Sequence, residues 1–393
     1  MDAGTRDTDR GTGSPDQVGE ENARTDVDDV DIEGSRPKAV DRYGFLCSDA
    51  FHQAHQLPPA VLHARRQKEA ERTLKWVKMI KKWETYGPGG AKNFKLKRRV
   101  RKGIPDAIRG LVWYRMSDAE QGRLLFPDID MIDTSNVPAQ VIDEIGRDID
   151  RTFPQHEFFI QEESPGQVAL LRVLIRYAAV DPEVGYCQGM GFLAALFLTY
   201  MPEEQAFYCF HAVLARKSAP LRLFYLPRLC ELQKALWVFG ELGQRYLGPL
   251  WTHLSAEMMH PSMFFTEWCM TLFVRGFGFD LTTRVWDVLI NEGSYKIVYR
   301  VSLALLKYFE MEFMSMSFEK IMGFMREMAA RIDADRLMEI AWALPLTQGA
   351  IEHFETLYLD ELAEKTEAKE KRAQAKAAKD KEKERGEKER GEK

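Results

Sequence analysis

The sequence predicts an all-α protein built around one large domain of many helices. Between residues 61 and 360, apolar residues recur almost everywhere with the i, i+3, i+4 spacing of one helix face. Alternating apolar and polar runs joined by Asn-Gly or Asp-Gly turns, which would indicate β-hairpins, are missing from the sequence. No fixed-period repeat is visible, so we do not expect a solenoid.

The helical pattern is clearest in three segments, which begin at Leu74 (LKWVKMIKKW), Leu170 (LLRVLIRYAAV) and Arg300 (RVSLALLKYF). A fourth run, GFLAALFLTYM at 191–201, is shorter than the ~20 residues that cross a bilayer and is predicted to be a buried helix. Helix-breaking residues divide the chain into helices of ordinary length, and they include Gly103, Pro105, Pro154, Pro182 and Pro202.

Two polar segments flank this domain. Residues 1–60 form an acidic N-terminal segment that is predicted to be disordered, since about the first 40 residues hold almost no large apolar side chain. Residues 361–393 are nearly all Glu, Lys, Ala and Arg, which predicts a solvated helix or a coil. Because neither segment has the apolar content to join a core, a fragment of about residues 65–360 is expected to keep the activity of the chain.

Composition narrows the class of protein. The chain has 393 residues, 45% of them hydrophobic, and a formal net charge of −5, so no global field would attract nucleic acid or an anionic membrane. Its five cysteines are scattered and never form C-x-x-C, which favours reduced thiols. The residues after Met1 contain no apolar signal core. We therefore expect a cytoplasmic protein.

The usual equipment of an enzyme is missing from the sequence. There is no G-x-x-x-x-G-K-[ST] phosphate loop, no H-E-x-x-H, no G-x-S-x-G and no kinase H-R-D set. The histidines at 52, 55 and 63 lie close together, but their spacing alone favours surface histidines over a metal site. No metal site is predicted.

Arg151 is predicted to lie at the C-terminal end of a helix. In the segment VIDEIGRDIDRTFP, Glu144, Asp148 and Arg151 follow one another at helical spacing, and Pro154 ends the helix just beyond the arginine. A cation at a helix C-terminus offsets the macrodipole, which is one sufficient explanation for the arginine. An alternative is that the guanidinium serves a function.

Gln188 lies in a glycine-rich stretch, VGYCQGMGF, where three glycines within seven residues allow the backbone to approach another group closely. A glutamine amide can both donate and accept hydrogen bonds, which suits the positioning of a water molecule. A helix start that happens to carry glutamine explains the pattern equally well.

Three motifs in order resemble the signatures of the TBC domain family, the GTPase-activating proteins of Rab-type small GTPases. They are RKGIPDAIRGLVW from Arg101, IGRDIDRTFPQHEFF from Ile145 and YCQGM from Tyr186, and together they span residues 101–190. The likeness extends over about residues 75–306, and KWVKMIKKWE is similar to the branch related to the Tre oncoprotein domain.

This resemblance implies a dual-finger mechanism, in which Arg151 and Gln188 enter the active site of a GTP-bound Rab in trans and so regulate vesicle trafficking. The chain would then be an activator with no substrate turnover and no cofactor of its own, because the partner supplies GTP and Mg²⁺. Asp148 and Tyr186 would position the fingers. The remaining motif residues are expected to be structural, and they are Arg101, Gly103, Pro105, Arg109 and Trp113.

Two alternatives stay open. The first is a non-catalytic TBC-like scaffold that binds a small GTPase or a membrane without accelerating hydrolysis. The second concerns KNFKLKRRVRK, the basic run from Lys92 to Lys102, which could contact lipid on endomembranes as a peripheral site. Nucleic acid is not expected as a partner, since Phe94 alone offers little stacking surface in that run.

Overall fold

The computed structural model of the protein describes residues 40–46, 59–216 and 221–391. Within these ranges the chain forms helices and no strand, apart from two isolated bridges that involve residues 40–46. The predicted all-α class is therefore confirmed. None of the described helices is both long enough and apolar enough to cross a bilayer.

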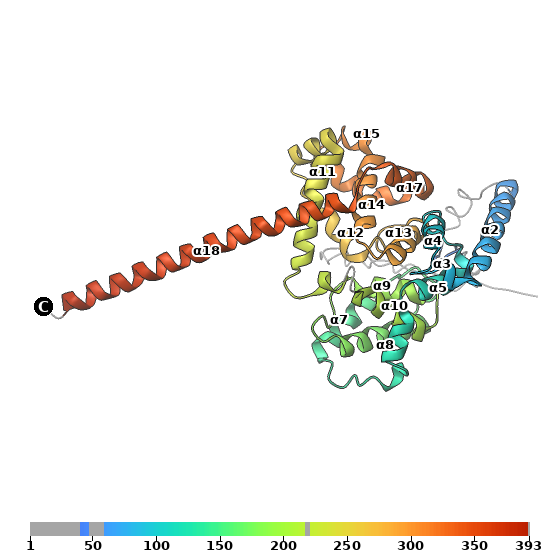
Figure 1. Cartoon of the computed structure of the whole chain (residues 1–393), viewed down its shortest axis with the longest axis horizontal. Coiled ribbons are helices and arrows are strands. Elements are labelled where there is room, and N and C mark those ends of the chain that lie inside the picture. The colour runs from blue at the N-terminus through green and yellow to red at the C-terminus, as the bar shows by residue number, and fades with distance from the viewer. Residues whose placement is uncertain (1–39, 47–58, 217–220, 392–393) are drawn as a thin grey trace, which may run out of the picture. The chain divides into compact units, whose positions relative to one another are not determined.

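The first half of the domain contains the predicted motifs. In Figure 1 its helices run from blue to green. Their bounds are α2 Pro59–Ile80, α3 Trp83–Tyr86, α4 Asn93–Val100, α5 Asp106–Met116, α6 Ala119–Leu125, α7 Ala139–Ile149, α8 Pro165–Val180, α9 Met190–Leu198 and α10 Glu203–Ala215, with a short 3-10 turn at Ile129–Met131.

The second half runs from yellow to red in Figure 1. It contains α11 Cys230–Ala256, α12 Phe265–Thr271, α13 Phe279–Glu292, α14 Lys296–Tyr308, α15 Glu310–Phe313, α16 Phe318–Glu327, α17 Ala334–Ala343 and α18 Gln348–Gly391, with 3-10 turns at Leu221–Tyr225, Pro261–Met263 and Met328–Arg331.

Helix α9 lies at the centre of the first half. Every residue from Met190 to Leu198 is buried, and the helix packs against α7, α8, α10 and α12. This confirms the buried helix predicted from the apolar run at 191–201. Helix α14 has the same role in the second half, where it packs against α11, α12, α13 and α17. A helix that is apolar on every side needs neighbours on every side, which explains why α9 is central. Helix α14 carries Arg300 as well, but all its residues from Ile297 to Leu306 are buried.

Most of the predicted breakers lie at helix boundaries. Pro105 and Pro202 directly precede α5 and α10, where proline's missing N–H costs nothing. Pro182 follows the end of α8. Pro249, which was not among the predicted breakers, lies inside α11, and Gly248 before it has φ 39° and ψ −104°. Helix α11 is therefore two helical pieces joined at a kink.

The predicted disordered segment at 1–60 was wrong for residues 40–46, which form a turn against the domain. Residues 1–39 and 47–58 lie outside the described residues, so the prediction for them stays a prediction. At the other end, α18 continues as a helix to Gly391, and its side chains from 362 to 376 are exposed. Of the two forms predicted for the C-terminal tail, this is the solvated helix.

Candidate functional site

Arg151 lies in the turn that ends α7. The backbone N–H groups of Arg151 and Thr152 bond to the carbonyls of Asp148 and Ile149 at 3.2 and 2.9 Å, which continues one loose turn beyond the helix. Phe153 then adopts φ 52°, a left-handed conformation that is unusual for a bulky residue, and the helix cannot continue. The Arg151 side chain is 57% exposed, so the guanidinium faces solvent at the helix end.

The buried residue Asp148 holds this turn through hydrogen bonds to Arg151 and Thr152. Its side chain is only 2% exposed, and its Oδ1 accepts a hydrogen bond from Nη2 of Arg151 at 2.5 Å. The Thr152 hydroxyl bonds to the Asp148 carbonyl at 2.7 Å, which closes the same turn. A charge-assisted bond from a buried carboxylate holds the guanidinium in one place while most of its N–H groups stay available.

The second oxygen of Asp148 holds the loop that carries Gln188. Oδ2 accepts the hydroxyl of Tyr186 and, at 3.0 Å, the backbone N–H of Gly189. Burial, and after it the neighbouring Asp148, raise the pKa of Tyr186 above its ordinary value, so the phenol keeps the proton that it donates. Arg151 and the Gln188 loop are therefore fastened to one carboxylate.

Gln188 itself is exposed and makes no hydrogen bond with the described part of the chain. The next residue, Gly189, has φ 102°, a conformation that favours glycine at the start of α9. Gly191 allows the two halves of the site to meet, since a Cβ there would lie 3.2 Å from the Thr152 hydroxyl and 3.3 Å from that of Tyr186. The amide side chain thus projects from a rigid loop beside the Arg151 turn.

A cavity of about 370 Å³ opens next to Arg151. Five of its eleven lining residues are phenylalanines, and Arg275 also lines it, with the guanidinium 5.9 Å from the centre of the Phe192 ring. Arg275 also pairs with Glu267 at 3.4 Å, with both side chains about half exposed. An apolar cavity with a half-exposed cation at its edge, beside an exposed arginine, suits contact with another protein.

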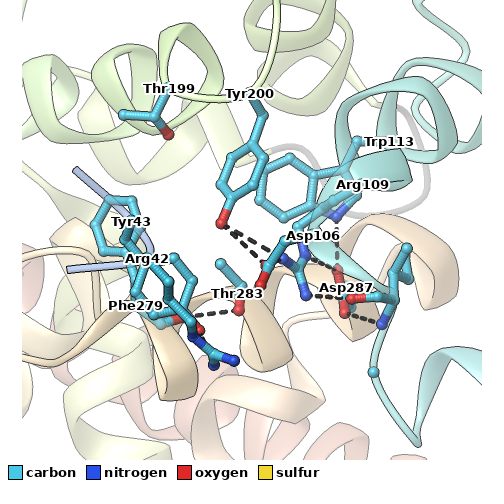
Figure 2. Close-up of polar contacts among 12 residues, drawn as sticks. Arg42, Tyr43, Asp106, Arg109, Trp113, Thr199, Tyr200, Phe279, Thr283 and Asp287 are labelled. Atoms are coloured by element: carbon cyan, nitrogen blue, oxygen red, sulfur yellow. Dashed lines mark hydrogen bonds and ion pairs between the residues drawn. The ribbon is translucent and has the colours of Figure 1, made fainter. Parts of the chain in front are cut away.

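The first motif, residues 101–113, meets a different carboxylate. Asp287 on α13 is fully buried, and Figure 2 shows Arg109 and Trp113 converging on it. Oδ1 accepts from Trp113 Nε1 at 2.8 Å and from Arg109 Nε at 3.2 Å, while Oδ2 accepts the backbone N–H of Ile104 at 2.8 Å. Burial alone would lower the pKa of Arg109, but Asp287 outweighs it and raises the pKa above its ordinary value.

The other residues of this motif also lie at helix junctions. Gly103 has φ 90°, and a Cβ there would lie 2.8 Å from the Cδ of Arg284. Arg101 pairs with Glu292 at 2.6 Å. Within the described part of the chain, no polar contact of residues 101–113 reaches the turn at 148–154. The sequence did not single out Asp287, because a lone aspartate in an amphipathic helix carries no local signal of burial.

No group of histidines, cysteines and carboxylates among the described residues could hold a metal ion. His63 is exposed, and the histidines at 52 and 55 lie outside the described residues.

A family model described as the Rab-GTPase-TBC domain matches residues 106–314, more than half of the chain. The chain belongs to the RabGAP-TBC family. The matched region contains Asp148, Arg151, Tyr186 and Gln188, together with Arg109, Trp113 and Asp287.

Three curated TBC relatives show how much is shared. The human Ecotropic viral integration site 5 protein homolog is 31% identical over 311 residues, which cover 77% of this chain and 37% of that protein. Mouse Carabin is 33% identical over 71% of this chain and 61% of its own length. Mouse TBC1 domain family member 10A is 34% identical over 71% of this chain and 54% of its own length. The chain thus spans only part of the length of these relatives.

Two solved TBC domains share the fold. The crystal structure of the Chlamydomonas flagellar RabGAP TBC domain is 28% identical, with a TM-score of 0.62, and the match covers 77% of this chain and 99% of that one. The Ypt/Rab-GAP domain of Gyp1p is 18% identical with a TM-score of 0.55, over 72% and 99%, and this second likeness shows the fold alone.

Proposed function

We propose that this TBC domain stimulates GTP hydrolysis by a GTP-bound Rab-family GTPase, and that Arg151 and Gln188 enter the partner's active site together. The observation that carries the proposal is the shared anchor, since the buried Asp148 fixes the Arg151 guanidinium and the loop of Gln188 at once. Both side chains are exposed, and Arg151 lines a phenylalanine-rich cavity on which a partner could dock.

The chemistry of phosphoryl transfer explains these two residue types. In the transition state, negative charge spreads over the γ-phosphoryl oxygens, and a planar, permanently charged guanidinium neutralises it. Arg151 would have this role, with an effect of roughly 10³ to 10⁵ in rate. Gln188 would orient the attacking water through its amide. GTP and Mg²⁺ come with the partner, so this chain would turn over no substrate of its own.

Arg151→Lys tests the proposal, because lysine keeps the positive charge but not the fork of N–H groups. If Arg151 is a finger, single-turnover hydrolysis by the responding Rab, chosen from a panel of GTP-loaded Rabs, should fall by orders of magnitude while the melting temperature stays close to that of the unaltered protein. Arg147→Lys is a matched control, since Arg147 is an exposed arginine on the same helix. Gln188→Ala should also slow hydrolysis, and its effect should be less than additive with that of Arg151→Lys.

The alternative is a scaffold that binds a GTPase without accelerating hydrolysis. A folded Arg151→Lys protein with near-normal turnover would contradict the finger role, and binding of GTP-loaded Rab without any stimulation across the panel would favour the scaffold.

We also infer contact with an anionic membrane surface in the cytoplasm, as would suit an activator that acts on vesicle traffic. A cavity of about 690 Å³ lies where the basic run at 92–102 meets α2, α13 and α17, and its lining is mostly basic, including Lys68, Arg72, Lys75, Arg98, Lys102 and Arg284. Burial, and then the nearby Arg284, lower the pKa of Arg72. Nε of Arg284 is buried and lacks a hydrogen-bond partner among the described residues. Asp335 pairs with Arg284 at 2.6 Å, and Glu71 and Glu339 also line the cavity, so the basic side chains there are only partly neutralised. A phosphorylated headgroup would offset the remaining positive charge.

Vesicle sedimentation can distinguish a specific headgroup-binding site from non-specific attraction between basic side chains and an anionic membrane. The double variant Lys75→Glu, Arg98→Glu reverses two charges that line the cavity. The control is the double variant Lys95→Glu, Lys97→Glu, which reverses two charges on α4 that do not line the cavity. A headgroup site predicts that the first pair weakens binding to polyphosphoinositide vesicles much more than the second, and that a soluble inositol polyphosphate competes. Equal losses for both pairs, or preferential binding of RNA, would overturn this inference.

A further inference from the structure

Residues 40–46 form a tight turn, called the strap below, which lies outside the family match and before the predicted domain boundary at 61. A bridge joins Val40 to Leu46. One carboxylate oxygen of Asp41 accepts the backbone N–H groups of Tyr43 and Phe45 at 2.8 and 2.9 Å. The conformation of the strap therefore depends on Asp41, a short polar side chain of the kind that closes turns.

The strap pairs through its backbone with the segment that follows Arg151. The N–H of Leu46 donates to the carbonyl of Gln155 at 2.8 Å, and the N–H of Glu157 donates to the carbonyl of Gly44 at 2.9 Å. These two bonds form a short antiparallel pairing centred on residues 45 and 156. A backbone segment that has no helix of its own thereby gains partners for its polar groups.

His156 adds a side-chain contact to this pairing. Its Nδ1 accepts the N–H of Phe158 at 3.1 Å, so Nε2 carries the proton and donates it to the carbonyl of Tyr43 at 2.8 Å. Burial lowers the pKa of His156, which keeps the ring in this neutral form. The approach is so close that a Cβ on Gly44, whose φ is 91°, would lie 2.8 Å from Nε2.

Aromatic packing joins the strap to the Arg151 turn. The Phe45 ring meets the rings of Phe153 and Phe279 edge-on, at centroid distances of 5.5 and 4.9 Å. Tyr43 lies against Phe279 at 5.6 Å, as Figure 2 shows. Phe153, with its left-handed backbone, is two residues from Arg151, and Phe45 lines the same cavity as both. The strained turn is thus covered by the strap.

The segment after Arg151 makes few other backbone bonds to the rest of the domain, although the Phe153 ring also packs against Phe159 and Phe192. On the helix side the guanidinium is held by Asp148, but residues 152–157 belong to no helix. The next anchor comes from the start of α8, where Ser164 bonds to the carbonyl of Phe158 at 3.1 Å. Between these points the backbone bonds of the strap hold the turn in place. A small displacement of a reacting group is costly in rate, so such support matters to function.

We propose that the strap is a positioning element for Arg151, which sets the orientation of the finger and so the rate of the hydrolytic step. This inference rests on the proposed function of Arg151. It reverses the expectation that a fragment of residues 65–360 would keep full activity, because that fragment lacks the strap.

The test uses the full chain and three substitutions. Phe45→Ala removes the packing against Phe153, Phe45→Leu restores an apolar side chain, and Asp41→Ala opens the turn without touching the core. Arg42→Ala is the control, since Arg42 is exposed and contacts Tyr43 on the outer side of the strap. Single-turnover hydrolysis over a range of activator concentrations gives the maximal rate and the half-saturating concentration, and hydrogen exchange of residues 151–159 reports the turn directly.

A positioning role predicts that Phe45→Ala and Asp41→Ala lower the maximal rate about 10-fold or more while changing the half-saturating concentration little. Phe45→Leu should recover most of the rate, and exchange at 151–159 should accelerate in the two slow variants but not in Arg42→Ala. If Phe45→Ala does not fold, the rate measured for Asp41→Ala tests the positioning role on its own. If Phe45→Ala and Asp41→Ala hydrolyse GTP at normal maximal rates while Arg151→Lys is slow, the strap proposal is wrong and the proposed function stands. A near-normal rate with Arg151→Lys would overturn both the strap proposal and the proposed function.

Discussion

Asp148→Asn is the substitution that bears most directly on the shared anchor. Asparagine has nearly the same shape as aspartate, so the 2% exposed pocket should still be filled. The amide has only one oxygen, however, and its NH₂ group cannot accept a hydrogen bond. Three donors reach the carboxylate, from Arg151, Tyr186 and Gly189, so at least one of them must lose its acceptor.

The size of the effect follows from the bond that is lost. A hydrogen bond to a charged group contributes roughly 1.5–3 kcal/mol, and each 1.36 kcal/mol of barrier is about tenfold in rate. If the contact with Arg151 serves to hold the finger, the maximal rate of hydrolysis should fall by about 10- to 100-fold. The free energy of unfolding should fall by about 1–3 kcal/mol, because the buried charged acceptor of the Tyr186 hydroxyl and the Gly189 N–H is replaced by a neutral amide.

Single-turnover hydrolysis and thermal melts measure both effects. Glu144→Gln is the matched control, since Glu144 is an exposed carboxylate one turn earlier on α7, and it should change neither quantity. In an Arg151→Ala background the effect of Asp148→Asn should shrink to the part exerted through the Gln188 loop. A well-folded Asp148→Asn protein with a normal rate, or full additivity with Arg151→Ala, would refute the shared-anchor reasoning.

Three further predictions concern stability. Asp287→Ala leaves the buried Arg109 with only the partly exposed Asp106 as a carboxylate partner and removes the acceptor of Trp113 and of the Ile104 N–H. It should lower the free energy of unfolding in urea by about 3–5 kcal/mol, so a loss near zero would contradict the structural role of the first motif. Burial lowers the pKa of His156 and His211, so the unfolded chain binds protons more readily, and this contribution to stability should be complete above about pH 6.5 and lost below it. Melts across this range check it, and His156→Gln should narrow the difference. A chain that ends after residue 364 should melt normally because residues 365–376 are exposed, whereas one that ends at 346 loses the buried Ile351 and Phe354 and should melt lower.

Local features of this protein were predictable from its sequence because their causes are local. Helical spacing of apolar residues, prolines at helix boundaries and the uncharged run of α9 each act within a few residues, and the structure places helices and boundaries where these features predict them. The turn at Arg151 also follows from neighbours in the chain, namely Asp148 three residues before it and Pro154 three residues after.

The hydrogen bonds between residues far apart in the sequence could not be predicted from local patterns. A buried carboxylate is stable only if donors surround it, and the donors to Asp148 lie 38 and 41 residues further along the chain. Asp287 meets Arg109 across 178 residues. Pattern alone gives no sign of either pairing, although the family motifs marked Tyr186 and Arg109 as residues to examine.

The strap shows this limit most clearly. Residues 40–46 hold apolar side chains at Val40, Tyr43, Phe45 and Leu46, but they follow about 40 residues with almost none. No helical or strand pattern marks them, and they were therefore assigned to a disordered segment. They are ordered because Phe45 and Tyr43 fill a surface made by Phe153 and Phe279, and because free backbone groups at Gln155 and Glu157 accept and donate to them. The sequence by itself determined which segments become helices and where Arg151 emerges. Only the tertiary structure decided what holds Arg151 in place, because burial and hydrogen bonding depend on surfaces that exist after the chain has folded.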